Sequence, residues 1–189
     1  MKVYQIIEIC LLVVWLTVPF VYRRHNNFYF FLFLGLIDIL AKILWNGLSI
    51  SSLYAWLPFH YLMLIGFNRD YFFKNIKLKL LGLVPILIIN PFLSYFTIKS
   101  FVLVFHLIFI ILFVRLFASQ LIKNNSLSGY YILMIIYESI FIIRLLASLR
   151  EVRIGMEISY LGSFIQIFIG ILLIIIQLWK NKSDVITAQ

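Results

Sequence analysis

Ionisable side chains occur in this sequence inside segments that are otherwise almost entirely apolar. Asp38 and Lys42 stand four residues apart in one such segment, and Glu138 precedes Arg144 by six residues in another. A charge in hydrocarbon is costly, so these side chains are expected to face the protein interior and to pair there. Carboxylates in such a place can exchange a proton or a cation, and the basic groups can balance them or meet an anionic group. The sequence therefore predicts a site for protons, ions or small charged solutes.

Further polar residues complete the predicted binding site. They are Glu8, Tyr54, His60, Tyr160 and Gln166. At a helical rise of about 1.5 Å per residue, Asp38, His60 and Glu138 come out near the middle of a bilayer. Glu8, Lys42 and Arg144 fall in the outer half, and Gln166 and His106 lie between the two levels. We expect a shared polar layer to which six of seven helices contribute.

The charges of this layer do not balance. Three carboxylic acids, Glu8, Asp38 and Glu138, face two permanent cations, Lys42 and Arg144. One negative charge remains if all of them ionise, so a carboxyl group is protonated, a histidine is charged or a cation is bound. Each alternative predicts sensitivity to protons or cations.

A purely structural interpretation stays open beside this one. Asp38 and Lys42, at positions i and i+4, can form a self-contained pair that only fixes helix packing. His106, alone in its segment, is expected to be a hydrogen-bonded interior residue, and Arg115 is expected to extend toward the interface. Ionisable residues inside a membrane are functional by default, which favours the binding interpretation.

Composition indicates the elements that must position these residues. Of the 189 residues, 64% are hydrophobic and 12% are charged, whereas a soluble domain is about half apolar and about a quarter charged. The apolar runs are long and continuous, which predicts membrane-spanning helices rather than the alternating strands of a membrane barrel. The formal charge of +9 comes from residues that flank these runs. That pattern is typical of topology determinants and not of a nucleic-acid interface.

Polar clusters divide the chain into seven predicted spans of about 20 residues each. The spans are 3–22, 28–46, 49–67, 80–95, 100–120, 129–149 and 159–179. Together they predict an all-α, polytopic membrane protein, with one transmembrane bundle over residues 1–180 and a short cytoplasmic tail over 181–189. The first span contains Glu8, lacks a small-residue cleavage site and ends at Arg23 and Arg24, so we expect a retained helix and not a signal peptide.

Lysine and arginine residues set the expected orientation. With the N-terminus outside, nine of the sixteen lie on the cytoplasmic side, four lie on the outer side and three lie within spans. This asymmetry favours an N-out, C-in arrangement.

Two parallel three-helix units joined by the fourth span are a further prediction. In the second and sixth spans a mid-span acid is followed by a base. In the third and seventh spans a tyrosine precedes a mid-span polar residue by six positions. Transporters are often built from such repeats, and chance similarity among apolar helices is the alternative.

A three-plus-one-plus-three layout with the N-terminus outside resembles that of the sugar-transporting SWEET and PQ-loop families. The local similarity consists of Pro19 near the inner end of the first span, residues 45–47 at the end of the second, and Gly162 with Gln166 in the seventh. A proline–glutamine pair is absent, because Phe20 follows Pro19, and the fifth span has no proline. The resemblance implies a shared layout and does not extend to membership.

No catalytic or cofactor motif accompanies the polar layer. The sequence contains no HExxH, GxSxG, Walker or GxGxxG pattern, and the last span has no lysine for a retinal Schiff base. Asp38, His60, His106 and Glu138 lie on four separate spans, so a metal site is unsupported. The single cysteine, Cys10, is expected to be a small buried hydrophobic residue. We expect neither an enzyme nor a bound cofactor.

The sequence favours an integral membrane carrier for a small solute or ion, proton-coupled through the carboxylates and the histidine. The alternative is a ligand-sensing or accessory membrane subunit that works with a separate protein, docked on the basic inner loop at 69–79. A structural protein and, last, a motif-free membrane enzyme also stay open. Expected partners are the lipid bilayer, a small solute, a proton or a cation, and a protein partner or second copy. Richness in Ile, Phe, Asn and Lys indicates an AT-rich microbial genome and hence a bacterial inner membrane.

Overall fold

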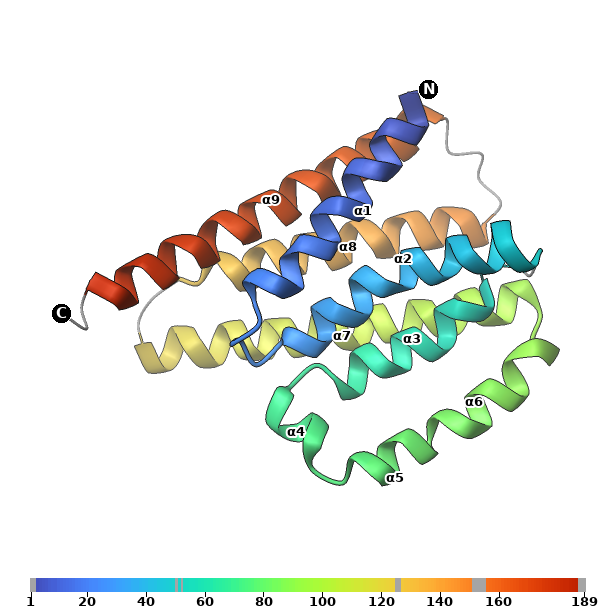
Figure 1. Cartoon of the computed structure of the whole chain (residues 1–189), viewed down its shortest axis with the longest axis horizontal. Helices are drawn as coiled ribbons and strands as arrows, with labels where there is room; N and C mark the ends of the chain where they lie inside the picture. The colour runs from blue at the N-terminus through green and yellow to red at the C-terminus, as the bar shows by residue number, and fades with distance from the viewer. Residues whose placement is uncertain (1–2, 50, 52, 125–126, 151–155, 187–189) are drawn as a thin grey trace. The chain divides into compact units, whose positions relative to one another are not determined.

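The computed structural model describes residues 3–49, 51, 53–124, 127–150 and 156–186, and most of these residues are helical. The helices are α1 (Val3–Val21), α2 (Phe28–Leu48), α3 (Leu53–Ile65), α4 (Arg69–Phe73), α5 (Ile76–Leu81), α6 (Leu83–Ile89), the 3₁₀ turn η1 (Asn90–Phe92), α7 (Tyr95–Asn124), α8 (Gly129–Leu149) and α9 (Met156–Ile186) (Figure 1). No strand occurs within the described ranges. The prediction of an all-helical chain is confirmed.

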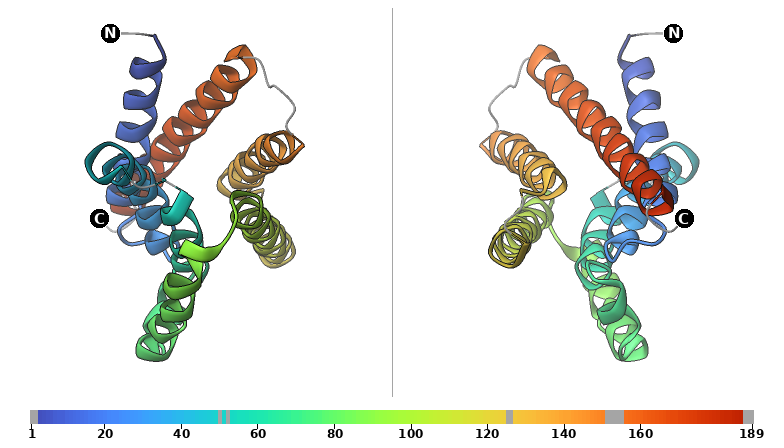
Figure 2. Two further views of the ribbon diagram at one scale, coloured as in Figure 1. Left: turned by 90° about the vertical axis from the view of Figure 1, so that its right-hand side faces the viewer. Right: turned by 90° about the vertical axis from the view of Figure 1, so that its left-hand side faces the viewer.

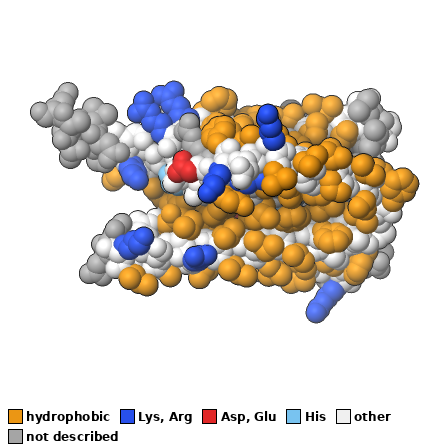
Figure 3. All heavy atoms as spheres, turned by 90° about the horizontal axis from the view of Figure 1, so that it is seen from below, with side chains coloured by type: hydrophobic (Ala, Val, Ile, Leu, Met, Phe, Trp, Pro, Cys, Tyr) orange, Lys and Arg blue, Asp and Glu red, His pale blue; other side chains and the backbone are white. Residues whose placement is uncertain are grey.

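Three of the described helices are long and apolar enough to cross a membrane. They cover Tyr95–Lys123 in α7, Gly129–Leu149 in α8 and Tyr160–Asn181 in α9, and a shorter apolar helix covers Gln5–Val21. Large apolar side chains stay exposed along these helices, and Figure 3 shows one face covered mostly by hydrophobic side chains with few Lys and Arg. Exposed apolar surface on this scale is typical of a protein in contact with lipid. The chain is an integral membrane protein of the helical type.

Some helix limits differ from the predicted span limits. α8 occupies the range 129–149, whereas α7 begins at Tyr95, five residues before the predicted start at 100. The range 80–95 contains the end of α5, all of α6 and η1, and the first residue of α7. Gly82 lies between α5 and α6 and Pro91 lies within η1, and glycine and proline both disfavour continuous helix. α9 continues to Ile186 and includes most of the predicted tail. Residues 151–155 and 187–189 lie outside the described residues.

Residues 18–105 form one compact unit. Ser49, with φ 55° in the left-handed region, ends α2 and helps reverse the chain so that α3 packs antiparallel to α2. Gly66, just after α3, allows a close approach, because a Cβ there would lie 2.9 Å from the Cβ of Tyr29. At the same end of the pair, Nδ2 of Asn27 donates a 2.7 Å hydrogen bond to the Phe67 carbonyl. Backbone proximity and this bond together fix the α2–α3 pair.

α5 and α6 follow one another beside α3 (Figures 1 and 2). Asn90, at the break between α6 and η1, is 2% exposed, and its Nδ2 donates a 2.7 Å hydrogen bond to the Tyr54 carbonyl on α3. The Tyr61 hydroxyl, also on α3, donates a 2.9 Å hydrogen bond to the Lys79 carbonyl in α5. Each bond satisfies a backbone carbonyl and fastens the interrupted segment to α3.

Residues 1–17 and 106–189 form the second compact unit, in which α8 packs against α9. One face of α9 is apolar and exposed, with residues recurring every three or four positions: Leu161, Phe164, Phe168, Ile171 and Ile175. Another face is buried and carries Gly162, Gln166, Ile169, Gly170 and Leu173. α9 thus buries its small and polar residues and exposes large apolar ones, as expected for a helix in lipid.

The first part of α1 also belongs to this second unit. Gly170 on α9 lies so close to Val14 that a Cβ at Gly170 would overlap the valine side chain. The ring of Trp15 lies 4.7 Å, between centroids, from the ring of Tyr137 on α8. The two compact units do not coincide with the two three-helix units expected from the sequence, and the internal repeat stays a prediction.

Candidate functional site

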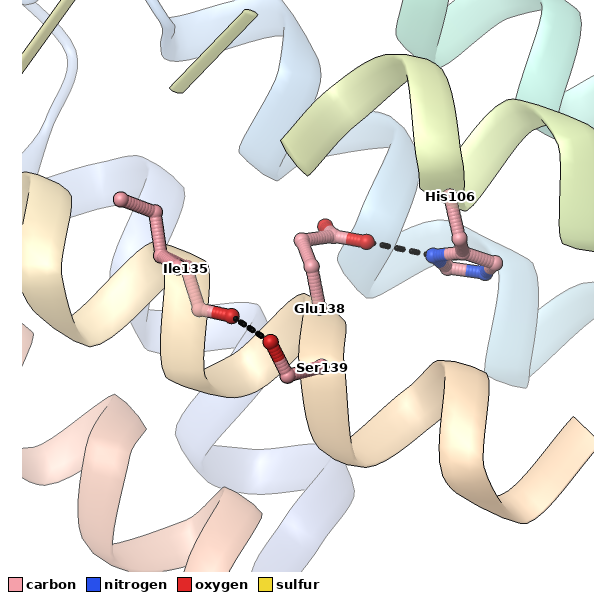
Figure 4. Close-up of polar contacts among 4 residues, drawn as sticks. All are labelled: His106, Ile135, Glu138 and Ser139. Carbon is pink, nitrogen blue, oxygen red and sulfur yellow. Dashed lines mark hydrogen bonds and ion pairs between the residues drawn. The ribbon is translucent and has the colours of Figure 1, made fainter. Parts of the chain in front are cut away.

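Two ionisable side chains meet inside the second unit. Glu138 on α8 and His106 on α7 both have 0% exposed surface. Nδ1 of His106 lies 2.5 Å from Oε2 of Glu138, with the two side chains pointing toward one another from their helices (Figure 4). Each group thereby compensates part of the cost of burying the other.

Aromatic rings enclose the imidazole. Phe141, three residues after Glu138 on α8, stacks on the His106 ring with centroids 4.1 Å apart and an interplanar angle of 27°. Phe109 on α7 meets the same ring edge to face at 6.0 Å. These contacts fix the plane of the ring, and the burial of both side chains keeps water away from the hydrogen bond. The electrostatic interaction therefore acts in a low-dielectric environment.

The His106–Glu138 pair is neutral when one proton is shared at the contact, on either Glu138 or His106. Losing this proton leaves one negative charge and gaining a second leaves one positive charge, and either is costly in an apolar interior. Oε1 of Glu138 has no hydrogen-bond partner within the described part of the chain. A buried carboxyl oxygen that has no described hydrogen-bond partner and lies beside an imidazole is suited to taking up and releasing a proton when its surroundings change.

Ser139, next to Glu138, is engaged within its own helix. Its Oγ donates a 2.8 Å hydrogen bond to the Ile135 carbonyl, one turn earlier on α8 (Figure 4). Such bonding back to the helix is common for serine in helices. The hydroxyl is therefore not arranged with His106 as a nucleophile–base pair.

A second polar contact joins α8 to α9. Nη1 of Arg144, which is half-buried, donates a 3.2 Å hydrogen bond to Oε1 of Gln166, which is 3% exposed. Gly162, one turn earlier on α9, lies against the arginine stem, and a Cβ there would be 3.2 Å from Arg144 Cδ. The structure thus brings two residues of the predicted site together, while Glu138 has a different partner.

His60 on α3 is 3% exposed and bonded within its own helix. Its Nδ1 lies 2.6 Å from the Trp56 carbonyl oxygen, and because a carbonyl only accepts, Nδ1 carries the proton. The ring lies 6.2 Å from that of Phe105. Tyr54, on the same helix, is half-buried, and its carbonyl accepts the hydrogen bond from Asn90.

The remaining residues of the predicted site are less deeply placed. Asp38 and Lys42 are half-buried on α2, Tyr160 is half-buried on α9, and Glu8 is exposed on α1. None of the four is without an interaction partner. The nine predicted residues divide between the compact units, with Asp38, Lys42, Tyr54 and His60 in residues 18–105 and the other five in the second unit.

The sequence prediction does not include His106 in the binding site. A span beginning at 100 places His106 nearer the surface than Glu138. α7 begins at Tyr95 instead, so His106 lies eleven residues, or about 16 Å, into the helix. Glu138 lies eleven residues before the end of α8 at Leu149, and since consecutive helices run antiparallel, both residues reach the same depth. With α7 starting at Tyr95, His106 and Glu138 lie equally far from the adjacent ends of α7 and α8, which indicates that they can pair.

Other kinds of site have no support among the described residues. No group of three or more His, Cys, Asp or Glu side chains in the described ranges is placed to hold a metal ion. Cys10, expected to be buried, is exposed on α1, where the helix turns an apolar face outward. In comparisons with known proteins, no family model, no curated protein and no solved structure matches this chain.

Proposed function

We propose that this protein is a membrane carrier that couples the movement of a small solute or ion to protons, with His106 and Glu138 as the proton-binding pair. The proposal includes seven spans, an N-out, C-in orientation and a place in a bacterial inner membrane. Asp38, Lys42 and His60 are further proposed solute- or ion-binding residues, within residues 18–105.

The observation that carries the proposal is the complete burial of this pair on two helices that can cross a membrane. Ionisable residues that pair inside a membrane mark proton relays and ion pathways. A role in packing alone is served equally well by apolar residues, since buried ionic pairs rarely add stability over them. The presence of a histidine and a glutamate at this point therefore favours chemistry over packing.

The charge balance supports proton coupling. The count of three acids against two permanent cations does not include His106. When Glu138 and His106 share one proton, the pair as a whole is neutral. Adding or removing one proton changes that balance by one charge, which makes a proton the natural coupling ion.

The test uses the full-length protein in liposomes that contain a pH-sensitive dye. Amino acids, monosaccharides and monocarboxylates are added one class at a time, and the proton entry that each drives is recorded. We expect one class to accelerate proton entry with the wild type. Glu138→Gln, which keeps the size and hydrogen bonding of the side chain but cannot release a proton, should abolish the acceleration.

Asp70→Asn is the matched control, because it makes the same acid-to-amide change at an exposed position on the short helix α4. It should transport like the wild type. Equal rates for the wild type and Glu138→Gln would remove the pair from the mechanism. Absence of solute-driven proton entry, together with a stoichiometric protein partner on purification, would refute the carrier and favour the sensing or accessory subunit.

A further inference from the structure

The guanidinium of Arg144 carries a positive charge in a half-buried place. It has five N–H donors, and its described hydrogen bond goes to the neutral Gln166. No carboxylate within the described residues forms an ion pair with it. The side chain is half-buried between α8 and α9, where an uncompensated charge is costly. A bound anion would compensate that charge.

Gln166 supplies a second hydrogen-bond donor at the same place. Because a guanidinium can only donate, the carboxamide must turn its Oε1 toward Arg144, which fixes the position of Nε2 on the other arm of the group. Nε2 is buried and has no partner within the described part of the chain. A buried amide N–H that lacks an acceptor is costly. An acceptor group that reached both donors would satisfy Arg144 and Gln166 together.

We propose that Arg144 and Gln166 bind a monocarboxylate, and that monocarboxylates are the solute class of the carrier; this second part rests on the proposed function. A carboxylate presents two coplanar oxygens that match parallel N–H donors of a guanidinium. The Nε2–H of Gln166 donates to one of these oxygens. The single negative charge of the ligand balances Arg144.

Charge favours a monoanion over phosphate or a dicarboxylate. One negative charge makes the site neutral, whereas a second would be left uncompensated in a half-buried place. A monocarboxylate that crosses with one proton carries no net charge through the membrane. Glu138 stands six residues before Arg144 on α8, about 9 Å along the helix axis. The proposed proton-binding residue Glu138 and the proposed anion-binding residue Arg144 thus occupy separate positions on α8.

Gly162 sets the position of the arginine. With no side chain there, the stem of Arg144 lies directly on α9, and a Cβ would come within 3.2 Å of Cδ. The stem must then shift by a few tenths of an ångström if Gly162 is replaced by alanine. We expect Gly162→Ala to weaken anion binding several-fold, because it moves the guanidinium relative to Gln166.

Equilibrium dialysis tests the site without any transport step. Radiolabelled acetate and benzoate are dialysed against the full-length protein in lipid nanodiscs, with empty nanodiscs as the blank. Saturable binding above the blank is expected for the wild type. Acetamide and benzamide, which have the same shapes without the charge, should not compete. Inorganic phosphate should compete about tenfold more weakly than acetate.

Variants identify the residues. Arg144→Gln should weaken binding about tenfold or more, and Arg144→Lys, which keeps the charge but not the planar fork, should fall between it and the wild type. Gln166→Leu should also weaken binding. Gln177→Leu is the matched control, since Gln177 lies on the same helix and bonds to Asn181 at the surface. Circular dichroism confirms that each variant is folded.

Absence of saturable binding for both carboxylates overturns the proposal, and so does equal affinity in the wild type and Arg144→Gln. An arginine that only extends toward the membrane interface gives the second of these results. Carboxylate binding without solute-driven proton entry would refute the carrier function and leave the anion site in place.

Discussion

His106 and Glu138 stand 32 positions apart in the chain and meet through a 2.5 Å hydrogen bond between α7 and α8. Neither side chain is exposed to solvent. Each group therefore replaces, for the other, the water that it loses on burial. This mutual dependence makes the pair a thermodynamic unit whose members cannot be removed singly without loss.

Removing one member of the His106–Glu138 pair is expected to destabilise the protein more than removing both. Glu138→Leu and His106→Leu should each cost about 3–5 kcal/mol, because each leaves a buried polar partner behind. The double leucine variant should recover most of this loss. Unfolding in sodium dodecyl sulfate, followed by circular dichroism, measures the four free energies. Losses that simply add in the double variant would show two independent side chains.

Gly170→Ala should destabilise the contact between α1 and α9 by about 1–3 kcal/mol through overpacking, although alanine is the better helix former. The new methyl group overlaps Val14, whose β-branched side chain has one strongly preferred rotamer in a helix. Val14→Ala in the same chain should restore stability. Gly47→Ala is the control, since nothing lies within 4 Å of a Cβ at that position. A Gly170→Ala variant as stable as the wild type would contradict this contact.

Asn27→Ala should cost about 1–3 kcal/mol, because it leaves the Phe67 carbonyl without its side-chain donor. Asn27 is 3% exposed, so water cannot easily take its place. Amide hydrogen exchange should also become faster where α2 and α3 meet. Gln177→Ala removes a hydrogen bond at the surface and should change stability by no more than about 0.5 kcal/mol. Equal effects for the two variants would argue against a tie between α2 and α3.

His60 and His25 should adopt opposite tautomers. Nδ1 of His60 donates to the Trp56 carbonyl, whereas Nδ1 of His25 accepts a 3.2 Å hydrogen bond from the Asn27 N–H. In alkaline solution, where both rings are neutral, His60 should carry its proton on Nδ1 and His25 on Nε2. Two-bond correlations in ¹⁵N-labelled protein distinguish these forms, and His60→Asn and His25→Asn identify the resonances. The same tautomer at both positions would contradict one of the two hydrogen bonds.

The sequence predicts helix limits well where polar residues or glycine mark both ends, and α8 is the example. The start of α7 shows why the same rule can fail. The charge of Lys99 predicts a position in water at the end of the span. Lys99 is nevertheless only 3% exposed, and its Nζ lies 3.8 Å above the ring of Tyr95, one turn earlier. A cation stabilised by an aromatic ring of its own helix does not mark the end of that helix. Composition alone does not distinguish these two situations.

For the candidate site, the sequence indicates members but not partners. Arg144 and Gln166 both belong to the predicted polar layer, but their contact depends on how α8 and α9 pack at Gly162. Depth along a helix follows from counting residues. Rotation and crossing depend on side chains from other helices. The sequence therefore does not indicate the partner of Glu138, because a span that starts at 100 places His106 at a different level from Glu138, whereas α7 starts at Tyr95.

The close contact between Val14 and Gly170 has a consequence for the synthesis of the protein. A ribosome delivers α1 to the membrane long before Gly170 has been synthesised. Until then Val14 lacks its contact with α9, and the packing of α1 is incomplete. Maturation of this region is consequently tied to translation through α9. A chain interrupted before α9 would therefore lack the surface on which Val14 packs.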